Sequence, residues 1–181
     1  DNSPSFQSRQ AQWEQRVLTA EKDWQALQPA RMSAANGTVL TAAADNYILA
    51  TGKNPDTETY VLEFKAPAGE MTGLRIEAAP DVSLPAGGPG RDFYGNFLVN
   101  NVTVESGAAQ QLAKTGLKEI LRDEAMPFQN DLGGKIRQIW IVDASHLGKT
   151  PTIDGRVRVQ LLLVPEKPIK AAGDGMLRIT V

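Results

Sequence analysis

The sequence contains no cysteine among its 181 residues. This absence excludes disulfides, thiolate metal sites, a cysteine nucleophile and covalent attachment of haem through a C-x-x-C-H motif. A cysteine-free chain fits the cytosol, and it equally fits a bacterial periplasmic domain that needs no disulfides. We therefore expect this segment to carry no haem and no redox chemistry of its own.

Histidine and long hydrophobic runs are also scarce. The single histidine, His146, directly follows Ser145, and adjacent residues on a strand point to opposite faces, so they are poorly placed as nucleophile and base. Without a second histidine or a cysteine, a histidine-based zinc site is excluded as well. No apolar run approaches the roughly 18 residues of a membrane span, so we expect none.

An excess of charge of one sign is missing too. The chain has 19 lysines and arginines against 21 aspartates and glutamates, and its net charge is −2. Nucleic acids and anionic membranes are usually bound by a basic stripe, so we expect neither as the main partner. The first residue is Asp1 rather than methionine, so we expect a processed or excised piece whose targeting signal has been left out.

The first 28 residues have the hydrophobic period of a helix. The apolar positions are Phe6, Trp13, Val17, Ala20, Trp24 and Leu27. This three-and-four spacing, with polar residues between, predicts an amphipathic helix that ends before Pro29. We accordingly divide the chain into an N-terminal helix over residues 1–28, serving as a linker or packed appendage, and one domain over residues 29–181.

The second part consists of short segments with period two, separated by turn residues. Eight segments fit strands: TVLTA, NYILA, ETYVLEF, GLRIEAA, FLVNNVTVE, IRQIWIVD, RVRVQLLLV and MLRITV. In RVRVQLLLV, for example, Val157, Val159, Leu161 and Leu163 alternate with other residues and are expected to face inward. Many short strands with one polar face and no intervening helices predict an all-β, antiparallel β-sandwich.

Two further segments bear on the fold and on catalysis. Trp140 lies in the wholly apolar run IWIV and is predicted to be part of the core. Residues 107–134 interrupt the strand pattern and are interpreted as one short helix or irregular structure near an edge.

The acidic residues show no pair whose spacing indicates a catalytic cleft, so we do not expect an enzyme.

The segment LPAGGPGRDFYGNF, Leu84 to Phe97, contains the densest group of glycines and prolines. A P-loop would require G-x-x-x-x-G-K-[ST] leading into a helix. Here Arg91 and Asp92 follow the glycines, Pro89 removes one N–H donor, and the next element is a predicted strand. The glycine spacing also departs from the dinucleotide-binding fingerprint. The segment is therefore interpreted as a shaped loop rather than a phosphate site.

This loop carries the candidate ligand-binding residues, which are Arg91, Asp92, Phe93, Tyr94 and Asn96. A pyranose presents an apolar C–H face and a rim of hydroxyls, so a sugar site needs aromatic rings flanked by planar polar side chains. Phe93 and Tyr94 are the only aromatic pair in an evident loop, and they carry the hypothesis of a sugar ligand.

Oxygen-bearing side chains around the same loop raise the hypothesis of calcium. The candidate ligands are Asp81, Asp92, Asn96 and Glu105, and calcium takes six to eight oxygen ligands. No EF-hand pattern is present. The alternative is that these side chains form Asx turns and hydrogen bonds across the neck of the loop, and both interpretations are left open here.

The order of these segments resembles a known family. The segments FQSRQAQWEQRV and ATGKNPDTETYVLEF, then MTGLRIEAAPDVSLPAGGPGRDFYGNFLVNNVTVE and MLRITV, resemble the galactose-binding-like, carbohydrate-binding-module-like domain of large secreted planctomycete-type proteins. The resemblance implies a jelly-roll sandwich, an exported location in a bacterium, and a cytochrome c domain elsewhere in the polypeptide. It also implies a polysaccharide ligand.

Together these observations predict a non-catalytic carbohydrate-binding-type module, supported by calcium if the oxygen cluster binds it. Its expected partners are a polysaccharide or other glycan and the neighbouring domains of the same polypeptide. The alternative is a purely structural β-sandwich that packs against its neighbours and binds no small molecule. The orientation of Phe93 and Tyr94 distinguishes the two, because burial of both rings would remove the sugar platform.

Overall fold

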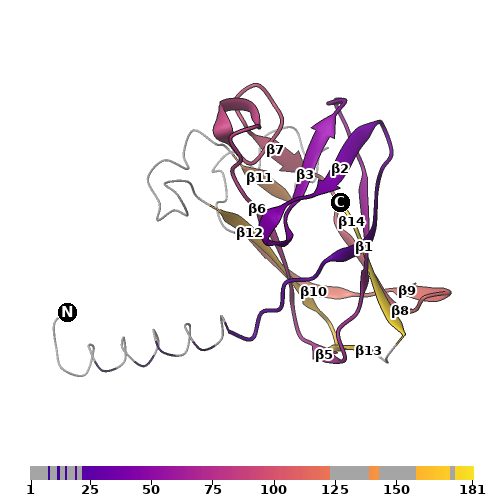
Figure 1. Cartoon of the computed structure of the whole chain (residues 1–181). Helices are drawn as coiled ribbons and strands as arrows, with labels where there is room; N and C mark the ends of the chain where they lie inside the picture. The colour runs from indigo at the N-terminus through magenta and orange to yellow at the C-terminus, as the bar shows by residue number, and fades with distance from the viewer. Residues whose placement is uncertain are drawn as a thin grey trace, which may run out of the picture.

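The computed structural model describes residues 8, 12, 15, 19, 22–122, 139–142, 158–171 and 174–181. Within these residues the structure is built mainly of strands (Figure 1), and every strand pair is antiparallel. The strands are β1 (Pro29–Ala34), β2 (Thr38–Ala42), β3 (Ile48–Gly52), β4 (Tyr60–Lys65), β5 (Gly69–Met71), β6 (Leu74–Ala78), β7 (Phe97–Val99), β8 (Thr103–Ala108), β9 (Gln111–Lys114), β10 (Leu117–Arg122), β11 (Trp140–Val142), β12 (Val159–Pro165), β13 (Ile169–Ala171) and β14 (Gly175–Thr180). The predicted all-β class is confirmed.

Two sheets form the body of this sandwich-like fold. One has five strands in the order β1-β4-β14-β8-β9, and the other has three in the order β10-β12-β6. The pairs β2-β3, β11-β7 and β13-β5 form small two-stranded sheets. In the larger sheet β14 lies between β4 and β8, and in the smaller one β12 lies between β10 and β6. Strands from late in the chain therefore occupy the interior of both sheets.

The core follows the alternation predicted from the sequence. Every second residue of β12 is buried, from Val159 to Pro165, and β14 buries Leu177 and Ile179 in the same way. These side chains belong to one buried cluster: Phe64, Leu74, Val102, Val104, Trp140, Val142, Val159, Leu161, Leu163, Ile169, Leu177 and Ile179. Because the cluster draws on strands of both large sheets, it forms one continuous hydrophobic core. The prediction that Trp140 is a core residue is confirmed, since it is 2% exposed.

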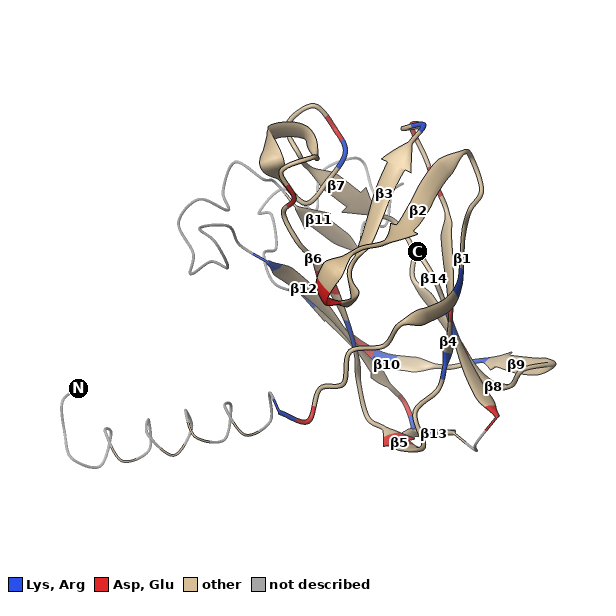
Figure 2. Cartoon of the chain, in the orientation of Figure 1, with Lys and Arg blue, Asp and Glu red and all other residues tan. Residues whose placement is uncertain are grey.

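The opposite face of the five-stranded sheet carries charges of alternating sign. One row of register partners runs across all five strands: Arg31, Glu63, Arg178, Glu105 and Lys114. Arg178 lies in the middle and pairs with both glutamates, at 2.8 Å to Glu63 and 3.2 Å to Glu105. Hydrogen bonds to Glu63 and then to Glu105 raise the pKa of Arg178. Positive and negative residues are likewise interspersed over the visible strands (Figure 2).

The predicted N-terminal helix does not extend to Leu27. Ser8, Gln12, Gln15 and Thr19 are helical, residues 24–28 are not, and the remaining positions of the predicted helix lie outside the described residues. The non-helical segment packs on the body instead. Trp24 lies under the guanidinium of Arg75, with 4.7 Å from the ring centroid to Cζ, and Leu27 packs against the core. Residues 24–28 therefore pack on the body of the domain where the sequence predicted the last turn of a helix.

The interpretation of residues 107–134 was wrong over its described part. Residues 107–122 contain the end of β8, then β9 and β10, where a short helix or irregular structure was expected. Gly107 has a φ of +146°, which favours glycine, and β8 and β9 form a hairpin. In the other sheet, β10 pairs with β12. Strand pairing thus overrides the helix-forming composition of this segment.

Other predictions fall partly outside the described residues. His146, Ser145 and Val157 lie outside the described residues. The segment FLVNNVTVE, predicted as one strand, is described and forms parts of two strands, β7 and β8. Among the described residues, no helix has the length and apolar character needed to cross a membrane.

Candidate functional site

The candidate site is residues 81–96 of the connection from β6 to β7, which we call the aromatic loop. It lies at the upper end of the view in Figure 1, above β6 and beside β7. A 3-10 turn, η2 (Pro85–Gly87), opens it. Backbone hydrogen bonds from Gly90 N to Gly95 O at 2.7 Å and from Gly95 N to Asp92 O at 3.0 Å close its second half. The loop thus has an internally bonded backbone.

Two glycines of the aromatic loop are required by close approach of the backbone. A Cβ on Gly90 would collide with the carbonyl of Asn96. Gly95 has a φ of +80°, and a Cβ there would lie 2.6 Å from the carbonyl oxygen of Pro85. Only glycine fits both positions without moving the backbone. The glycines therefore allow the backbone of this shaped loop to approach itself closely.

Asp92 stabilises the tip of the loop from within. Its Oδ1 accepts hydrogen bonds from the backbone N–H groups of Tyr94, at 2.9 Å, and Asn96, at 2.6 Å. This is the Asx-turn arrangement in which an aspartate bonds the backbone two residues ahead. The turn fixes the backbone that carries Phe93 and Tyr94.

Arg91 connects the aromatic loop to the β2-β3 hairpin. Its Nη1 donates to Thr38 Oγ1 at 3.1 Å and its Nη2 donates to the carbonyl of Gly52 at 2.9 Å. In return, Asn54 Nδ2 donates to the carbonyl of Arg91 at 2.7 Å. Because both terminal nitrogens of Arg91 bond the hairpin, we assign this residue to positioning the loop.

Glu58 in turn holds the start of the hairpin. Its carboxylate accepts hydrogen bonds from the backbone N–H groups of Asn36, Thr38 and Thr59, at 2.8, 3.2 and 2.9 Å. Desolvation raises the pKa of Glu58, but the bonds from Thr59, Asn36 and Thr38 outweigh it and lower the pKa to about 2. Thr38 also bonds Arg91, so Glu58, the hairpin and the aromatic loop form one connected polar network.

Acidification tests the contribution of Glu58. Its folded pKa is depressed from the ordinary 4.5 to about 2, so the stability it contributes is present above about pH 4.5 and is lost as the pH falls toward 2. Glu58→Gln should lower the melting temperature at neutral pH by roughly a few degrees. That difference from wild type should shrink steadily in thermal melts between pH 4.5 and 2. A difference that stays constant over this range would contradict the assignment.

The positioning role of Arg91 predicts a stability effect localised to this end of the domain. Arg91→Met keeps the apolar stem but removes both hydrogen bonds to the hairpin, so it should cost about 1–2 kcal/mol. Arg91→Lys, which cannot span both acceptors at once, should fall between wild type and Arg91→Met. Hydrogen exchange should show faster exchange in the aromatic loop and in the β2-β3 hairpin. Equal protection in all three proteins would refute the connection.

The two aromatic side chains of the loop point into solvent. Phe93 is 84% exposed and Tyr94 is 66% exposed. Their rings meet edge to face, with centroids 5.1 Å apart and an interplanar angle of 89°. Adjacent apolar groups left exposed together are typical of interaction sites, and these sit on a loop whose backbone is fixed by several hydrogen bonds. The outcome that would have removed the sugar platform, burial of both rings, is not what the structure shows.

Of the four predicted calcium ligands, three lie in the aromatic loop and the fourth, Glu105, lies in β8. Asp81 and Asp92 both bond within the aromatic loop, since Asp81 Oδ1 accepts from Ser83 N at 2.8 Å and from Ser83 Oγ at 2.6 Å. Asn96 closes the same loop through its backbone. Glu105 belongs to β8 and pairs with Arg178. Within the described ranges, no three histidine, aspartate or glutamate side chains gather as a metal site. The hydrogen bonds of Asp81 and Asp92 to backbone N–H groups two residues ahead are those of the Asx-turn alternative.

A second polar cluster covers the outer face of the three-stranded sheet. Glu77 accepts hydrogen bonds from Tyr47 Oη at 3.1 Å and from Arg158 Nη1 at 2.8 Å, and it pairs with Arg75 Nε at 3.1 Å. Burial first, and then the charge of Glu77, raise the pKa of Tyr47. Arg158 lies over the Tyr47 ring, 5.4 Å from its centroid, as Arg75 does over Trp24. These groups satisfy one another, so the cluster fastens the segments of Trp24 and Tyr47 to the sheet.

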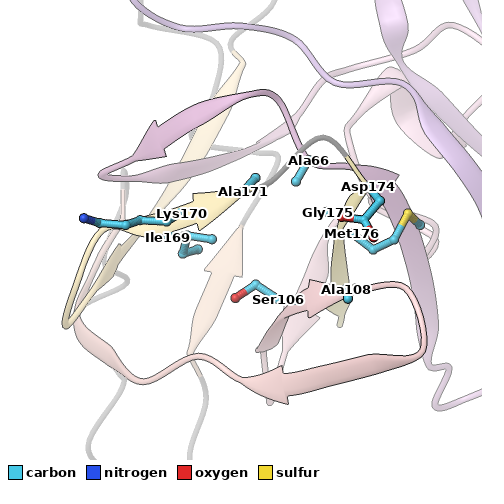
Figure 3. Close-up of a pocket in the computed structure, with 10 residues that line it drawn as sticks. Ala66, Ser106, Ala108, Ile169, Lys170, Ala171, Asp174, Gly175 and Met176 are labelled. Atoms are coloured by element: carbon cyan, nitrogen blue, oxygen red, sulfur yellow. The ribbon is translucent and has the colours of Figure 1, made fainter.

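A small pocket opens near β5 and β13, at the other end of the domain from the aromatic loop in Figure 1. It encloses about 130 Å³. Its walls, shown in Figure 3, combine the small residues Ala66, Ser106, Ala108, Ala171 and Gly175 with the larger side chains of Ile169 and Met176. The ammonium of Lys170 points away from the pocket and pairs with Glu70 at 2.9 Å. With no aromatic ring among the described residues of its walls, the pocket lacks the platform that the aromatic loop provides.

The sequence identified the loop but missed what holds it. Thr38, Gly52 and Asn54, which contact Arg91, lie 37 to 53 residues before it in the chain. Nothing in their local sequence distinguishes them from other turn residues. The one available signal was the isolated arginine after a glycine-rich turn, because a guanidinium there needs acceptors that the loop itself does not supply.

Comparison of the chain with protein-family models, with characterised proteins and with solved structures finds no match.

Proposed function

We propose that this chain is a non-catalytic binding domain of the carbohydrate-binding type, with Phe93 and Tyr94 as its ligand platform. The observation that carries the proposal is the exposure of both rings, 84% and 66%, on a loop with a fixed backbone. An aromatic face can cover the apolar C–H face of a sugar ring, while neighbouring polar groups bind the hydroxyls. Asp92 and Asn96 supply such groups beside the rings.

The hydrogen bonds of the aromatic loop favour binding because they reduce the conformational entropy that the loop loses when a ligand binds. A flexible loop would lose conformational entropy when it closed on a ligand. Here Asp92 fixes the tip and Arg91 fixes the neck, so the rings are positioned before the ligand arrives. Arg91 acts in this proposal by holding the platform.

The finer description of the fold belongs to the same proposal. We infer a jelly roll of the galactose-binding-like type, and the division into a five-stranded and a three-stranded sheet supports it. An exported location, a larger bacterial polypeptide and a neighbouring cytochrome c domain rest on the resemblance of the sequence alone. Calcium is proposed only as a structural supplement, through the oxygen-bearing side chains of Asp81, Asp92 and Asn96.

One observation favours the alternative of a structural domain. Val82, in the same loop, is 83% exposed, and an apolar side chain contributes little to sugar recognition. A surface that combined Val82 with the two rings would suit an apolar contact with a neighbouring domain. The alternative therefore predicts that Val82 contributes as much as the aromatic pair to contact with a neighbouring domain.

The proposal is tested by affinity electrophoresis of the purified domain in gels that contain a panel of soluble polysaccharides. We expect retardation by at least one polysaccharide and none in gels without it. Melting curves with and without millimolar calcium test the supplement separately, because a bound cation raises the melting temperature by mass action. Absence of retardation by every member of the panel would overturn the carbohydrate-binding proposal.

A further inference from the structure

We infer that the aromatic loop selects glycans that carry free amino groups, such as glucosamine oligomers, over acidic glycans. This inference rests on the proposed function and names the class of its ligand. It is drawn from the charges around the two exposed rings and from the angle between the rings.

The positive charge nearest to the rings in sequence is already engaged. Arg91 directs both terminal nitrogens to the β2-β3 hairpin, at 3.1 Å to Thr38 Oγ1 and 2.9 Å to the carbonyl of Gly52. Lys53 directly follows the same hairpin, and the methylene groups of its side chain lie against Gly37. An acidic sugar placed on the rings would therefore find no uncommitted guanidinium from the described residues of the loop itself.

The negative charge beside the rings remains available. Asp92 is exposed, and it directly precedes Phe93 in the chain. The two hydrogen bonds that it accepts, from Tyr94 N and Asn96 N, both use Oδ1. Oδ2 has no donor among the described residues and can accept a hydrogen bond from a ligand. An ammonium group would form a charge-assisted bond there, which is stronger than a bond from a hydroxyl.

The geometry of the rings adds to this preference. With an interplanar angle of 89° and centroids 5.1 Å apart, Phe93 and Tyr94 form two walls of a corner rather than one flat surface. Aromatic faces attract cations, and such corners are the basis of cages for ammonium groups. A sugar ring can rest on one wall while its amino group lies between the other wall and the carboxylate of Asp92.

Isothermal titration of the full chain with three oligosaccharides of equal length tests the inference. These are a glucosamine hexamer, an N-acetylglucosamine hexamer and a galacturonic acid hexamer, at a mildly acidic pH that keeps the amines charged. We expect the glucosamine hexamer to bind about tenfold more tightly than its N-acetylated form, since a hydrogen bond to a charged group is replaced by a neutral contact. The galacturonic acid hexamer should bind most weakly.

Two matched variants locate the effect. Asp92→Asn keeps an oxygen that can accept the N–H groups of Tyr94 and Asn96 but removes the charge, so it should reduce the preference to less than about threefold. Asp56→Asn makes the same change at an exposed aspartate outside the aromatic loop and should leave the preference intact. Melting curves of both variants establish that the loop and the domain remain folded.

The outcomes separate the inference from the proposed function. Equal binding of the glucosamine and N-acetylglucosamine hexamers, tightest binding of the acidic hexamer, or an unchanged preference in Asp92→Asn would each overturn the inference. In those cases the carbohydrate-binding proposal would stand, because a glycan still binds. If none of the three hexamers bound and no polysaccharide of the panel retarded the domain, both the inference and the carbohydrate-binding proposal would be overturned.

Discussion

Replacement of Phe93 and Tyr94 together by alanine should abolish retardation by polysaccharide and leave the melting temperature within about 2 °C of wild type. The rings are 84% and 66% exposed, so their removal exposes almost no core and creates no cavity. Aromatic anchors at the centre of a binding surface commonly account for about 2 kcal/mol or more of binding free energy. Removal of the pair should therefore lower the affinity for polysaccharide by at least roughly thirtyfold. Affinity electrophoresis over a series of ligand concentrations measures this loss.

Two control variants make this result specific. Val82→Ala removes an equally exposed apolar side chain of the same loop and should leave glycan binding unchanged. Phe97→Ala removes the partner of Trp140 in a similar edge-to-face pair, at 4.9 Å, and should lower stability because Phe97 packs against the core. If Val82→Ala weakened an interdomain contact while Phe93 and Tyr94 had no effect on glycan binding, the structural alternative would be favoured.

Gly90→Ala should cause the largest change in stability of any single substitution in the aromatic loop. The new Cβ would overlap the carbonyl of Asn96, and backbone cannot rotate away as a side chain can. The hydrogen bonds from Gly90 N to Gly95 O and from Asp92 N to Asn96 O would be displaced together. We expect a cost of about 3 kcal/mol or more, together with loss of glycan binding, because the tip that carries the rings would be rebuilt.

Chemical denaturation measures this cost, and two other glycines calibrate it. Gly73→Ala should be nearly neutral, since its Cβ would meet Leu162 and Trp24 at an ordinary 3.4 Å. Gly69 has a φ of +108° and nothing within 4 Å of a Cβ, so Gly69→Ala isolates backbone strain without collision, at roughly 1 kcal/mol. A Gly90→Ala protein as stable as Gly73→Ala would show that the loop is not packed as described.

Local alternation of residues was sufficient to predict the class of fold but not its full set of strands. RVRVQLLLV and MLRITV alternate, and the inward residues of their described parts are buried because each strand has one face on the core. The residues of β10, LKEILR, have no such clean alternation. Their pairing with β12 is decided by partners far away in the chain, such as Pro165 opposite Leu117, which no local window contains.

The candidate site shows the same division between local and distant causes. Asp92 bonds residues two and four positions ahead, so its Asx turn follows from the short segment itself. The exposure of Phe93 and Tyr94 depends on the orientation of the aromatic loop. Arg91 holds that orientation through its hydrogen bonds to the β2-β3 hairpin. Glu105 was grouped with the loop because it is near in sequence, whereas its position in β8 gives it Arg178 as a partner.

The interior position of β12 and β14 in their sheets has a consequence for how the domain is made. During synthesis the earlier strands leave the ribosome first. In the described sheets, β4 and β8 acquire their shared neighbour only when residues 175–180 emerge, and β6 and β10 acquire theirs only when residues 159–165 emerge. Until then their edges remain open to pairing with other chains. The five-stranded sheet is therefore completed only when β14 joins the pair β1-β4 to the pair β8-β9.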